Sequence, residues 1–164
     1  MMATRLRKES NEWLRKLLKD KHFKTVLNLG CGEDIDQEGN FYSNYFKWEN
    51  IIKIDKIKYV GVIQASAENL PLENNSVDFI FCHWMLYFLS KENRIKAVSE
   101  MKRVLKPKGK ILISSWALDI NELKSMMDLF NDFQILDTWK LDCEQSLDLR
   151  SGRAEIVYGV KNGK

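Results

Sequence analysis

Apolar residues recur along the chain with two different spacings, which predict helices and strands in alternation. Residues 4–21 carry apolar positions three or four apart with charged residues between them, as an amphipathic helix does. These positions are Leu6, Trp13, Leu14, Leu17 and Leu18. Lys91–Leu105 repeats the pattern and ends at Lys106-Pro107, because proline stops a helix. A third helix is predicted from its N-cap, Asp119, to about Asn131.

Short apolar runs between these helices predict the strands of a buried sheet. They lie at 25–29, 51–55, within 59–65, and at 77–84, 110–115, 133–141 and 154–160. Continuous apolar strands that alternate with helices indicate a largely parallel sheet covered on both faces. The last two runs, joined only by the polar loop 142–153, predict an antiparallel pair. We therefore predict an α/β fold: a doubly wound, mostly parallel seven-stranded sheet with an antiparallel terminal strand pair, in three α/β/α layers.

Two crossings between the predicted strands are unusually short. Residues 33–50 are polar and aromatic and predict at most a short helix within 41–48. Only Lys56–Lys58 separate Asp55 from Tyr59, whereas a parallel crossover usually takes about ten residues. We therefore expect the third strand to begin near Val62, after a crossing without a helix.

The composition is that of a soluble globular protein with one domain. The 164 residues are 45% hydrophobic and 30% charged, and no apolar run approaches the roughly 20 residues that span a bilayer. The N-terminal residues contain no apolar stretch typical of a secretory signal. Cys31, Cys82 and Cys143 show no CxxC spacing and only two histidines are present, so we expect no metal site and a cytoplasmic location.

The net charge of +3 arises largely from the first 24 residues, which carry eight Lys or Arg against three acidic residues. Such a cluster attracts an anionic partner, or it forms the solvated face of the first helix. The solvated face is the simpler interpretation, and both stay open.

A glycine turn follows the first predicted strand. In TVLNLGCGED, residues 25–34, the apolar run ends in Gly30-Cys31-Gly32, and the missing Cβ atoms let a ligand approach the backbone. Ligands of doubly wound sheets bind at this end of the strands. A dinucleotide fingerprint is incomplete, because Ile35 replaces its third small residue, and Glu33 and Asp34 would repel a pyrophosphate. The turn therefore suits a ligand whose nearby end is cationic or zwitterionic.

Asp55 ends the second predicted strand. An acid at this place accepts hydrogen bonds from the vicinal hydroxyls of a ribose. It is otherwise an ordinary strand-end residue, but its spacing from the glycine turn favours the ribose.

Four stretches in order resemble the motifs of a known enzyme family. They are VLNLGCGED, Asp55 in IIKID, QASAENLPLENNSVDFI and RVLKPKGKILIS, which together extend over about residues 25–116. The chain resembles the class I S-adenosylmethionine-dependent methyltransferases of the methyltransferase type 11 kind, whose sheet is Rossmann-like. The resemblance implies S-adenosyl-L-methionine as cofactor and one methyltransferase-like domain over 1–164. Its parts would be an N-terminal amphipathic helix (1–22), a cofactor-binding core (25–116) and a helix with the closing strand pair (117–164).

The resemblance also implies a set of cofactor-binding residues. They are Asn28, Gly30, Cys31, Gly32, Asp55, Lys56, Ser66, Ala67, Glu68, His83 and Trp84. The glycine turn would lie against the methionine part, Asp55 would hold the ribose, Lys56 would flank the adenine, and residues 66–68 would line the adenine edge. His83 and Trp84 would lie near the sulfonium and the acceptor, where Trp84 offers a π face or an apolar wall.

Four residues depart from the family pattern. Asn28 replaces an acid that helps to bind the cofactor's amino group, Asp34 replaces a third glycine, and Ser66 replaces an acid at the adenine. A fourth departure, Lys108 in place of a glycine in the late turn, matters mainly for that turn. Charge-assisted hydrogen bonds are the stronger class, so Asn28 predicts weaker binding unless Glu33 or Asp34 compensates. On the same ground, restoring Asp at position 28 is expected to tighten cofactor binding.

His83 is the candidate catalytic residue. Methyl transfer depends mostly on positioning and needs a base only if the acceptor loses a proton. Imidazole titrates near neutrality and suits that role. Alternatively, His83 only packs or bonds a backbone carbonyl beside the site. The acceptor site would be built from the first helix, the aromatic segment 41–48 and the loop 116–120, although these aromatics are equally suited to the core.

Two functions remain open at this point. The first is a methyltransferase with an unidentified acceptor, for which a small molecule is preferred. The second is a non-catalytic methyltransferase-like binding or partner subunit with a degenerate cofactor site, in which a protein partner completes the site. A nucleic acid acceptor lacks support, because Cys82-His83-Trp84-Met85 stands where the amino-methylating nucleic-acid enzymes carry Asn/Asp-Pro-Pro-Tyr/Phe.

Overall fold

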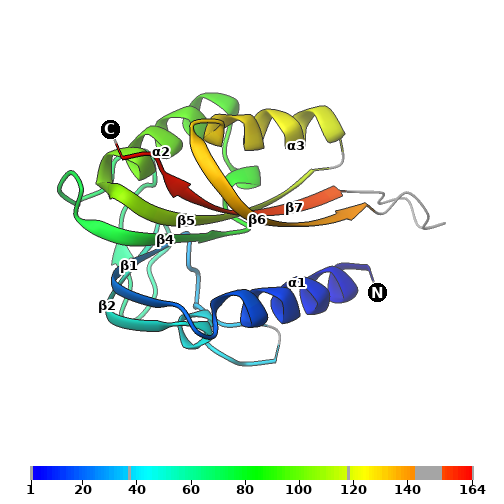
Figure 1. Cartoon of the computed structure of the whole chain (residues 1–164), viewed down its shortest axis with the longest axis horizontal. Coiled ribbons are helices and arrows are strands. Elements are labelled where there is room, and N and C mark those ends of the chain that lie inside the picture. Colours follow the sequence, from blue (N-terminus) through cyan, green and yellow to red (C-terminus); the bar gives the residue numbers. More distant parts are fainter. Residues whose placement is uncertain (1, 37, 118, 143–152, 164) are drawn as a thin grey trace.

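A seven-stranded sheet forms the centre of the structure, a computed structural model that describes residues 2–36, 38–117, 119–142 and 153–163. Its strands are β1 (His22–Leu29), β2 (Lys47–Asp55), β3 (Ile63–Gln64), β4 (Val77–His83), β5 (Leu105–Ala117), β6 (Phe133–Asp142) and β7 (Arg153–Lys161). They lie in the order β3-β2-β1-β4-β5-β7-β6 (Figure 1). The first five are parallel, and β7 pairs antiparallel with both β5 and β6. The predicted doubly wound sheet with an antiparallel terminal pair is confirmed.

Helices cover both faces of this sheet. Figure 1 shows α1 (Met2–Leu18) on one face, and α2 (Lys91–Val104) and α3 (Ile120–Met127) on the other. Three short 3-10 helices complete the structure: η1 (Tyr42–Tyr45), η2 (Leu86–Phe88) and η3 (Asp128–Phe130). The three predicted helices and the three layers are therefore confirmed. In the described part of the chain, no helix combines the length and the apolar character that crossing a membrane requires.

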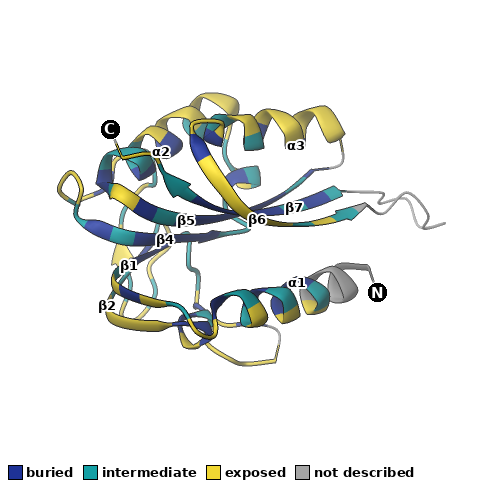
Figure 2. Cartoon of the chain, viewed as in Figure 1, coloured by how far each residue is buried: buried dark blue, intermediate teal, exposed yellow. Residues whose placement is uncertain are grey.

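The side chains of β4 alternate between the two layers of the core, as successive residues of a strand do. Phe79 and Phe81 pack under α1, and Phe79 stacks on Phe23 of β1 with ring centroids 4.1 Å apart. Ile80 and Cys82 point to the opposite face, toward the layer of α2 and α3. Figure 2 shows the resulting band of buried residues along the central strands. The two faces therefore hold separate apolar clusters, and the sheet between them fixes the positions of the strand ends.

Several element boundaries differ from the predictions. The first helix ends at Leu18 instead of residue 21, and β1 and β2 begin at His22 and Lys47 instead of residues 25 and 51. β5 begins at Leu105 instead of Lys110, because Leu105 already pairs with Val77 before a shift of register along β4. Lys108, with a φ of 62°, lies in this irregular stretch. The start of α3 is as predicted, because the carboxylate of the cap residue Asp119 accepts hydrogen bonds from two backbone N–H groups. The α-helix ends at Met127, and its predicted last turn is the 3-10 helix η3.

The two short crossings are as predicted. η1, of four residues, is the only helix in the described residues between β1 and β2, and the described residues 56–62 contain no helix. β3 comprises two residues, Ile63 and Gln64, at the edge of the sheet. The predicted loop 142–153, with Cys143, lies almost wholly outside the described residues.

Candidate functional site

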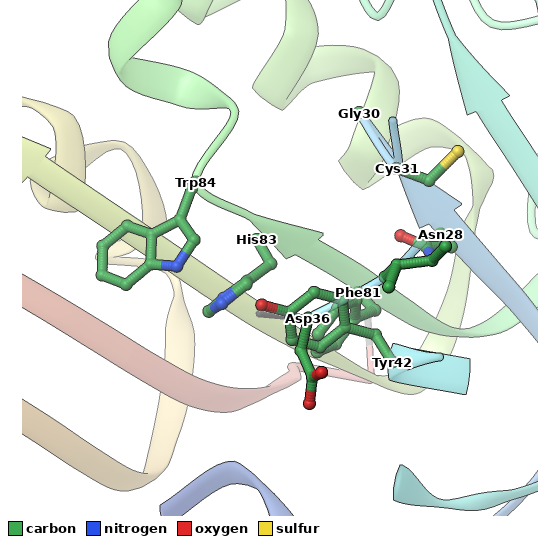
Figure 3. Close-up of a pocket in the computed structure, with 9 residues that line it drawn as sticks. Asn28, Gly30, Cys31, Asp36, Tyr42, Phe81, His83 and Trp84 are labelled. Atoms are coloured by element: carbon green, nitrogen blue, oxygen red, sulfur yellow. The ribbon is translucent and has the colours of Figure 1, made fainter. Parts of the chain in front are cut away.

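The strand order of the sheet reverses between β1 and β4, where the chain runs from β1 toward β2 on one side and from β4 toward β5 on the other. Such a switch point is the usual ligand site of a doubly wound sheet. A cavity of about 310 Å³ opens there (Figure 3). The residues that matter for its chemistry are Asn28, Gly30, Cys31, Tyr42, His83 and Trp84. Five of the eleven predicted site residues therefore line one cavity, and Tyr42 is an addition from the predicted aromatic segment.

The two glycines of the turn have different neighbours. Both adopt a left-handed backbone, with φ of 67° at Gly30 and 51° at Gly32. A Cβ on Gly30 would lie 2.3 Å from Cγ of Met85, so the absence of a side chain at Gly30 makes room for Met85. A Cβ on Gly32 would meet nothing within 4 Å. The position of the missing Cβ is therefore filled by Met85 at Gly30 and open at Gly32.

Asp55 holds the glycine turn in place from the end of β2. Its Oδ2 accepts a hydrogen bond of 2.9 Å from the Gly32 N–H, and its Oδ1 accepts one of 2.8 Å from the Ile57 N–H. A carboxylate oxygen has two acceptor positions, so each oxygen keeps one for a further donor. The carboxylate therefore lies beside the open backbone of Gly32 and can accept two hydroxyl groups. Lys56, between these contacts, is exposed.

Asn28 and Asp34, two of the residues that depart from the family pattern, are bonded to each other. The Asn28 Nδ2 donates to the Asp34 Oδ1 at 2.7 Å, and both residues are buried. Ser43 donates to the other carboxylate oxygen, which also forms an ion pair of 2.7 Å with the Lys53 Nζ. Lys53 balances the buried charge of Asp34. Asn28 therefore keeps its Oδ1 as the polar atom at the cavity.

Ser66, Ala67 and Glu68 form a local turn beside β2. The Ser66 hydroxyl donates to the Glu68 carboxylate, and the Glu68 N–H donates to the same hydroxyl oxygen at 3.4 Å. Ala67 packs against the core, and the Ala65 N–H donates to the carbonyl of Asp55 at 3.0 Å. This turn is therefore tied to the strand end that carries Asp55, on the side predicted for the adenine edge.

Cys31 is protonated in the ordinary pH range. Burial, together with the nearby carboxylates of Asp55 and Asp34, raises the pKa of its thiol to about 12. A thiol in this state is a weak nucleophile. Cys31 therefore lines the cavity as a small, neutral side chain.

His83 and Trp84 lie at the end of β4 and share one partner on β5. The backbone N–H of Trp84 donates to the Ser114 Oγ at 3.1 Å, and the same Oγ lies 2.5 Å from the His83 Nδ1. Trp84 has a φ of 59°, a strained conformation for a bulky residue and one that is concentrated at functional sites. Ser114 was not among the predicted site residues, although a serine inside a buried strand signals a specific hydrogen bond.

Aromatic rings surround the imidazole of His83. Its ring centroid lies 5.0 Å from that of Tyr42, 5.5 Å from that of Phe81 and 4.8 Å from that of Trp84. The Tyr42 hydroxyl donates to the Asn11 Oδ1 of α1 at 3.3 Å, so the first helix contacts this wall, and its part in an acceptor site stays a prediction. The catalytic role of His83 stays a prediction.

The aromatic segment 41–48 divides between the site and the rest of the molecule. Tyr42 lines the cavity, whereas Tyr45 and Phe46 are buried in the core under α1. Phe41 and Trp48 are exposed. Within this one segment, Tyr45 and Phe46 therefore belong to the core, and Tyr42 is the residue at the cavity.

Asp36 is a buried charge beside the cavity that the sequence analysis missed. Its carboxylate accepts a hydrogen bond of 2.5 Å from the Tyr45 hydroxyl and pairs with Arg15 of α1 at 2.8 Å. Its other oxygen accepts the N–H groups of Glu38 and Asn40, a local turn typical of aspartate. Burial by itself raises the pKa of Asp36, but these hydrogen bonds outweigh it and lower the pKa to about 2. The charge is therefore engaged within the protein.

Comparison with known proteins identifies relatives of one kind. The family described as "Methyltransferase domain" matches residues 27–113, more than half of the chain. A tRNA (carboxymethyluridine(34)-5-O)-methyltransferase of Arabidopsis thaliana is 41% identical over 98 residues, which cover 57% of this chain and 24% of that protein. Phosphoethanolamine N-methyltransferase 1 of Triticum aestivum is 31% identical over 124 residues, 68% of this chain and 25% of that protein.

An uncharacterized protein of Methanocaldococcus jannaschii is 32% identical over 132 residues, 74% of this chain and 52% of its own length. The chain thus spans about half of that relative and about a quarter of the other two.

Solved structures show the same fold at low sequence identity. The [4+2]-cyclase SpnF superposes with a TM-score of 0.70 at 15% identity, covering 95% of this chain and 81% of that one. The N-methyltransferase NodS of Bradyrhizobium japonicum, in complex with S-adenosyl-L-homocysteine, superposes with a TM-score of 0.62 at 13% identity, covering 85% and 79%. These likenesses confirm the Rossmann-like fold. Because one of these proteins is named a cyclase, the fold alone does not determine the reaction.

Proposed function

The chain belongs to the methyltransferase domain family, and on this premise we propose that it transfers a methyl group from S-adenosyl-L-methionine to a small-molecule acceptor. S-adenosyl-L-methionine is the cofactor of the family, and the residues of the cavity fit it. Asp55 offers two acceptor positions beside the open backbone of Gly32, and Asn28 offers an amide oxygen. Asn28 lines the cavity, whereas Asp55 and Gly32 lie outside its lining, next to Cys31 in the same turn; together they offer acceptors for an amino group and for hydroxyl groups.

The observation that carries the proposal is the contact between Asp55 and Gly32. It connects the second family motif to the first through a hydrogen bond of 2.9 Å at the switch point of the sheet. Gly32 has open space above it and a left-handed backbone, a combination that glycine alone accepts without strain. Gly39 and Gly61 have the same open space, so the contact with Asp55 at the switch point is what distinguishes Gly32.

We assign the roles as follows. The residues proposed to hold the cofactor are Asn28, Gly30, Cys31, Gly32, Asp55, Lys56, Ser66, Ala67 and Glu68. Gly30 acts indirectly, because it makes room for Met85 under the turn. His83 and Trp84 face the acceptor. The bound cofactor supplies an activated methyl group, and the protein contributes orientation and the exclusion of water by the rings around His83.

Two observations support a small-molecule acceptor. The cavity measures about 310 Å³, at the small end of the range for ligand pockets, and its acceptor side is walled by aromatic rings. The basic residues are divided between two places: Lys21 and Lys47 lie where β1 and β2 begin, at the edge of the sheet opposite to the cavity, whereas Arg15 of α1 pairs with Asp36, which lines the cavity. Their positions therefore do not distinguish a small acceptor from a nucleic acid. Relatives named for phosphoethanolamine and for ubiquinone/menaquinone agree with a small acceptor, whereas the relatives named for tRNA favour a nucleic acid acceptor.

Isothermal titration of the purified protein with S-adenosyl-L-methionine and, separately, with S-adenosyl-L-homocysteine tests the proposal. We expect both to bind in the micromolar range, followed by transfer of a labelled methyl group in a screen of small acceptors. Absence of heat and of a thermal shift with either ligand would overturn it. That result would favour the second function, a non-catalytic methyltransferase-like subunit whose site a protein partner completes.

A further inference from the structure

Ser114 determines which nitrogen of His83 carries the proton. Its hydroxyl is fully buried, and its oxygen already accepts a hydrogen bond of 3.1 Å from the backbone N–H of Trp84. Among the described residues, the His83 Nδ1 at 2.5 Å is the only acceptor within hydrogen-bond distance of the hydroxyl. A buried hydroxyl proton that is not donated leaves the cost of its desolvation uncompensated. Ser114 therefore donates to Nδ1, and a neutral imidazole that accepts at Nδ1 carries its proton on Nε2.

Trp84 supplies a second N–H group at the same place. Its Nε1 is buried, and no described residue accepts its proton. An indole nitrogen only donates, so the group needs an acceptor from outside the described protein. The ring centroids of Trp84 and His83 are 4.8 Å apart, and Figure 3 shows the indole nitrogen on the side of the ring that faces His83. The strained backbone that aims Trp84 is held by the same Ser114 oxygen.

No free charge competes for these two donors. Asp36 is the only charged residue among the described residues that line the cavity, and its side chain is closed to solvent. Tyr45, Arg15 and two backbone N–H groups already occupy its carboxylate. Cys31 stays neutral because burial and nearby carboxylates keep the pKa of its thiol high. The acceptor side of the cavity therefore offers donors and aromatic surface.

We propose that the His83 Nε2–H and the Trp84 Nε1–H together bind a carbonyl or anionic oxygen of the methyl acceptor. Acceptors of this class are planar molecules with an enolate, phenolate or carboxylate oxygen beside or at the atom that is methylated. Ser114 is the positioning residue, since it sets the tautomer of His83 and anchors Trp84. The His83 Nε2 and the Trp84 Nε1 both keep their protons. His83 therefore serves as a hydrogen-bond donor, and not as the base that the sequence suggested.

This inference rests on the proposed function for the identity of the ligand as a methyl acceptor, but its first test does not require the cofactor. Long-range ¹H–¹⁵N NMR of the full chain reports which imidazole nitrogen is protonated, and His22→Gln leaves only His83 to observe. We expect a protonated Nε2 and an unprotonated Nδ1 near neutral pH. Loss of this tautomer preference is expected in Ser114→Ala. Ser115→Ala is the matched control, because Ser115 is equally buried but bonds to the Met126 sulfur at 3.1 Å. A proton on Nδ1 in the unaltered chain would overturn the proposal.

The second test uses two probes with the same ring, benzoate and benzylamine, and follows the indole Nε1 resonance of Trp84 in the unaltered chain. Trp84→Phe serves only to assign that resonance. We expect benzoate to shift it and benzylamine to leave it unchanged. Ser114→Ala is expected to weaken benzoate binding about three- to tenfold, the range for one net hydrogen bond, and Ser115→Ala is expected to leave it unchanged.

Three results would contradict the two-donor site: a shift with benzylamine only, no shift with either probe, or equal benzoate affinity in Ser114→Ala. A different result would contradict only the proposed function. In that case isothermal titration with S-adenosyl-L-homocysteine would give no heat of binding, while the tautomer of His83 and the shift with benzoate remain as expected.

Discussion

The Asn28 Nδ2 lies 2.7 Å from the Asp34 Oδ1, so two of the residues that depart from the family pattern are partners. The acid missing from position 28 is present six residues later, in a left-handed conformation that brings its carboxylate back to the strand end. Lys53 and Ser43 hold the other oxygen of that carboxylate. The negative charge has therefore been moved and neutralised, and the cavity keeps a neutral amide.

Asn28→Asp is accordingly expected to destabilise the protein, in contrast to the tighter cofactor binding expected from the sequence alone. The substitution places two carboxylates at hydrogen-bond distance in a buried site and removes the donor to Asp34. Losing one partner of a buried hydrogen bond costs about 1–3 kcal/mol, and the like charges add to this. Urea denaturation at pH 7 measures the loss in the free energy of unfolding.

The exchanged pair Asn28→Asp with Asp34→Asn is the control for this prediction. It restores one acid and one amide at the same contact, so part of the lost stability should return. If Asn28→Asp alone is as stable as the unaltered protein and binds S-adenosyl-L-methionine more tightly, the hydrogen bond between Asn28 and Asp34 contributes little to stability.

Alanine at the two turn glycines separates a folding role from a binding role. Both substitutions impose a left-handed conformation on a residue with a Cβ, at about 1–2 kcal/mol. Gly30→Ala also drives a Cβ to 2.3 Å from the Met85 Cγ and should lose about 1–3 kcal/mol more through overpacking. Gly32→Ala meets open space and should lose less stability but most of the cofactor affinity. Thermal denaturation and calorimetric titration give the two readouts.

The double variant Gly30→Ala with Met85→Ala tests the cause assigned to Gly30. Removing the Met85 side chain should recover the overpacking part of the loss and leave the strain. If Gly32→Ala binds the cofactor as the unaltered protein does, the ligand does not lie against this backbone.

Asp55→Ala should weaken the binding of S-adenosyl-L-methionine by about 1.5–3 kcal/mol, the range for hydrogen bonds to a charged group. The loss includes the contact of 2.9 Å that holds Gly32, so the turn is loosened together with the ribose contact. Isothermal titration measures the affinity. Asp137→Ala on β6, at the far edge of the sheet, is the control and should bind normally. Unchanged affinity in Asp55→Ala would contradict the placement of the cofactor.

Much of the fold followed from local sequence patterns. Apolar spacing predicted the seven strands and the helices α1 and α2, and the cap residue Asp119 predicted α3, whereas the 3-10 helix η2 was not predicted. The start of β5 was wrong because the pairing of Leu105 with Val77 joins residues far apart in the chain. The apolar spacing of one strand does not predict how that strand pairs in register with its neighbour.

The site was predictable only where a motif carried it. The glycine turn and Asp55 are recognisable by type and spacing, and they lie together as predicted. Ser114 and Asp36 were missed because their roles depend on partners from other elements, His83 on β4 and Arg15 on α1. The chemistry of a buried polar residue is determined by the groups that tertiary structure brings to it.

The pKa of Asp36 makes a prediction about stability in acid. Burial alone would raise this pKa, but the hydrogen bonds from Tyr45, Asn40 and Glu38 lower it from 3.8 to about 2. A carboxylate with a lowered folded-state pKa stabilises the protein above its unfolded pKa. That stabilisation, about 2 kcal/mol for this shift, is lost as the pH falls from about 4 to about 2.

Asp36→Asn removes the titrating group, so the free energy of unfolding should fall less steeply over this pH window than in the unaltered protein. Tyr45→Phe deletes the hydrogen bond of 2.5 Å to the carboxylate, so the pKa of Asp36 should rise and acid unfolding should begin at higher pH. Urea titrations at several pH values measure both effects. Asp20→Asn, whose side chain is 85% exposed, is the control and should follow the unaltered curve. An unaltered acid slope in Asp36→Asn would mean that the contacts with Tyr45 and Arg15 do not distinguish the folded from the unfolded carboxylate.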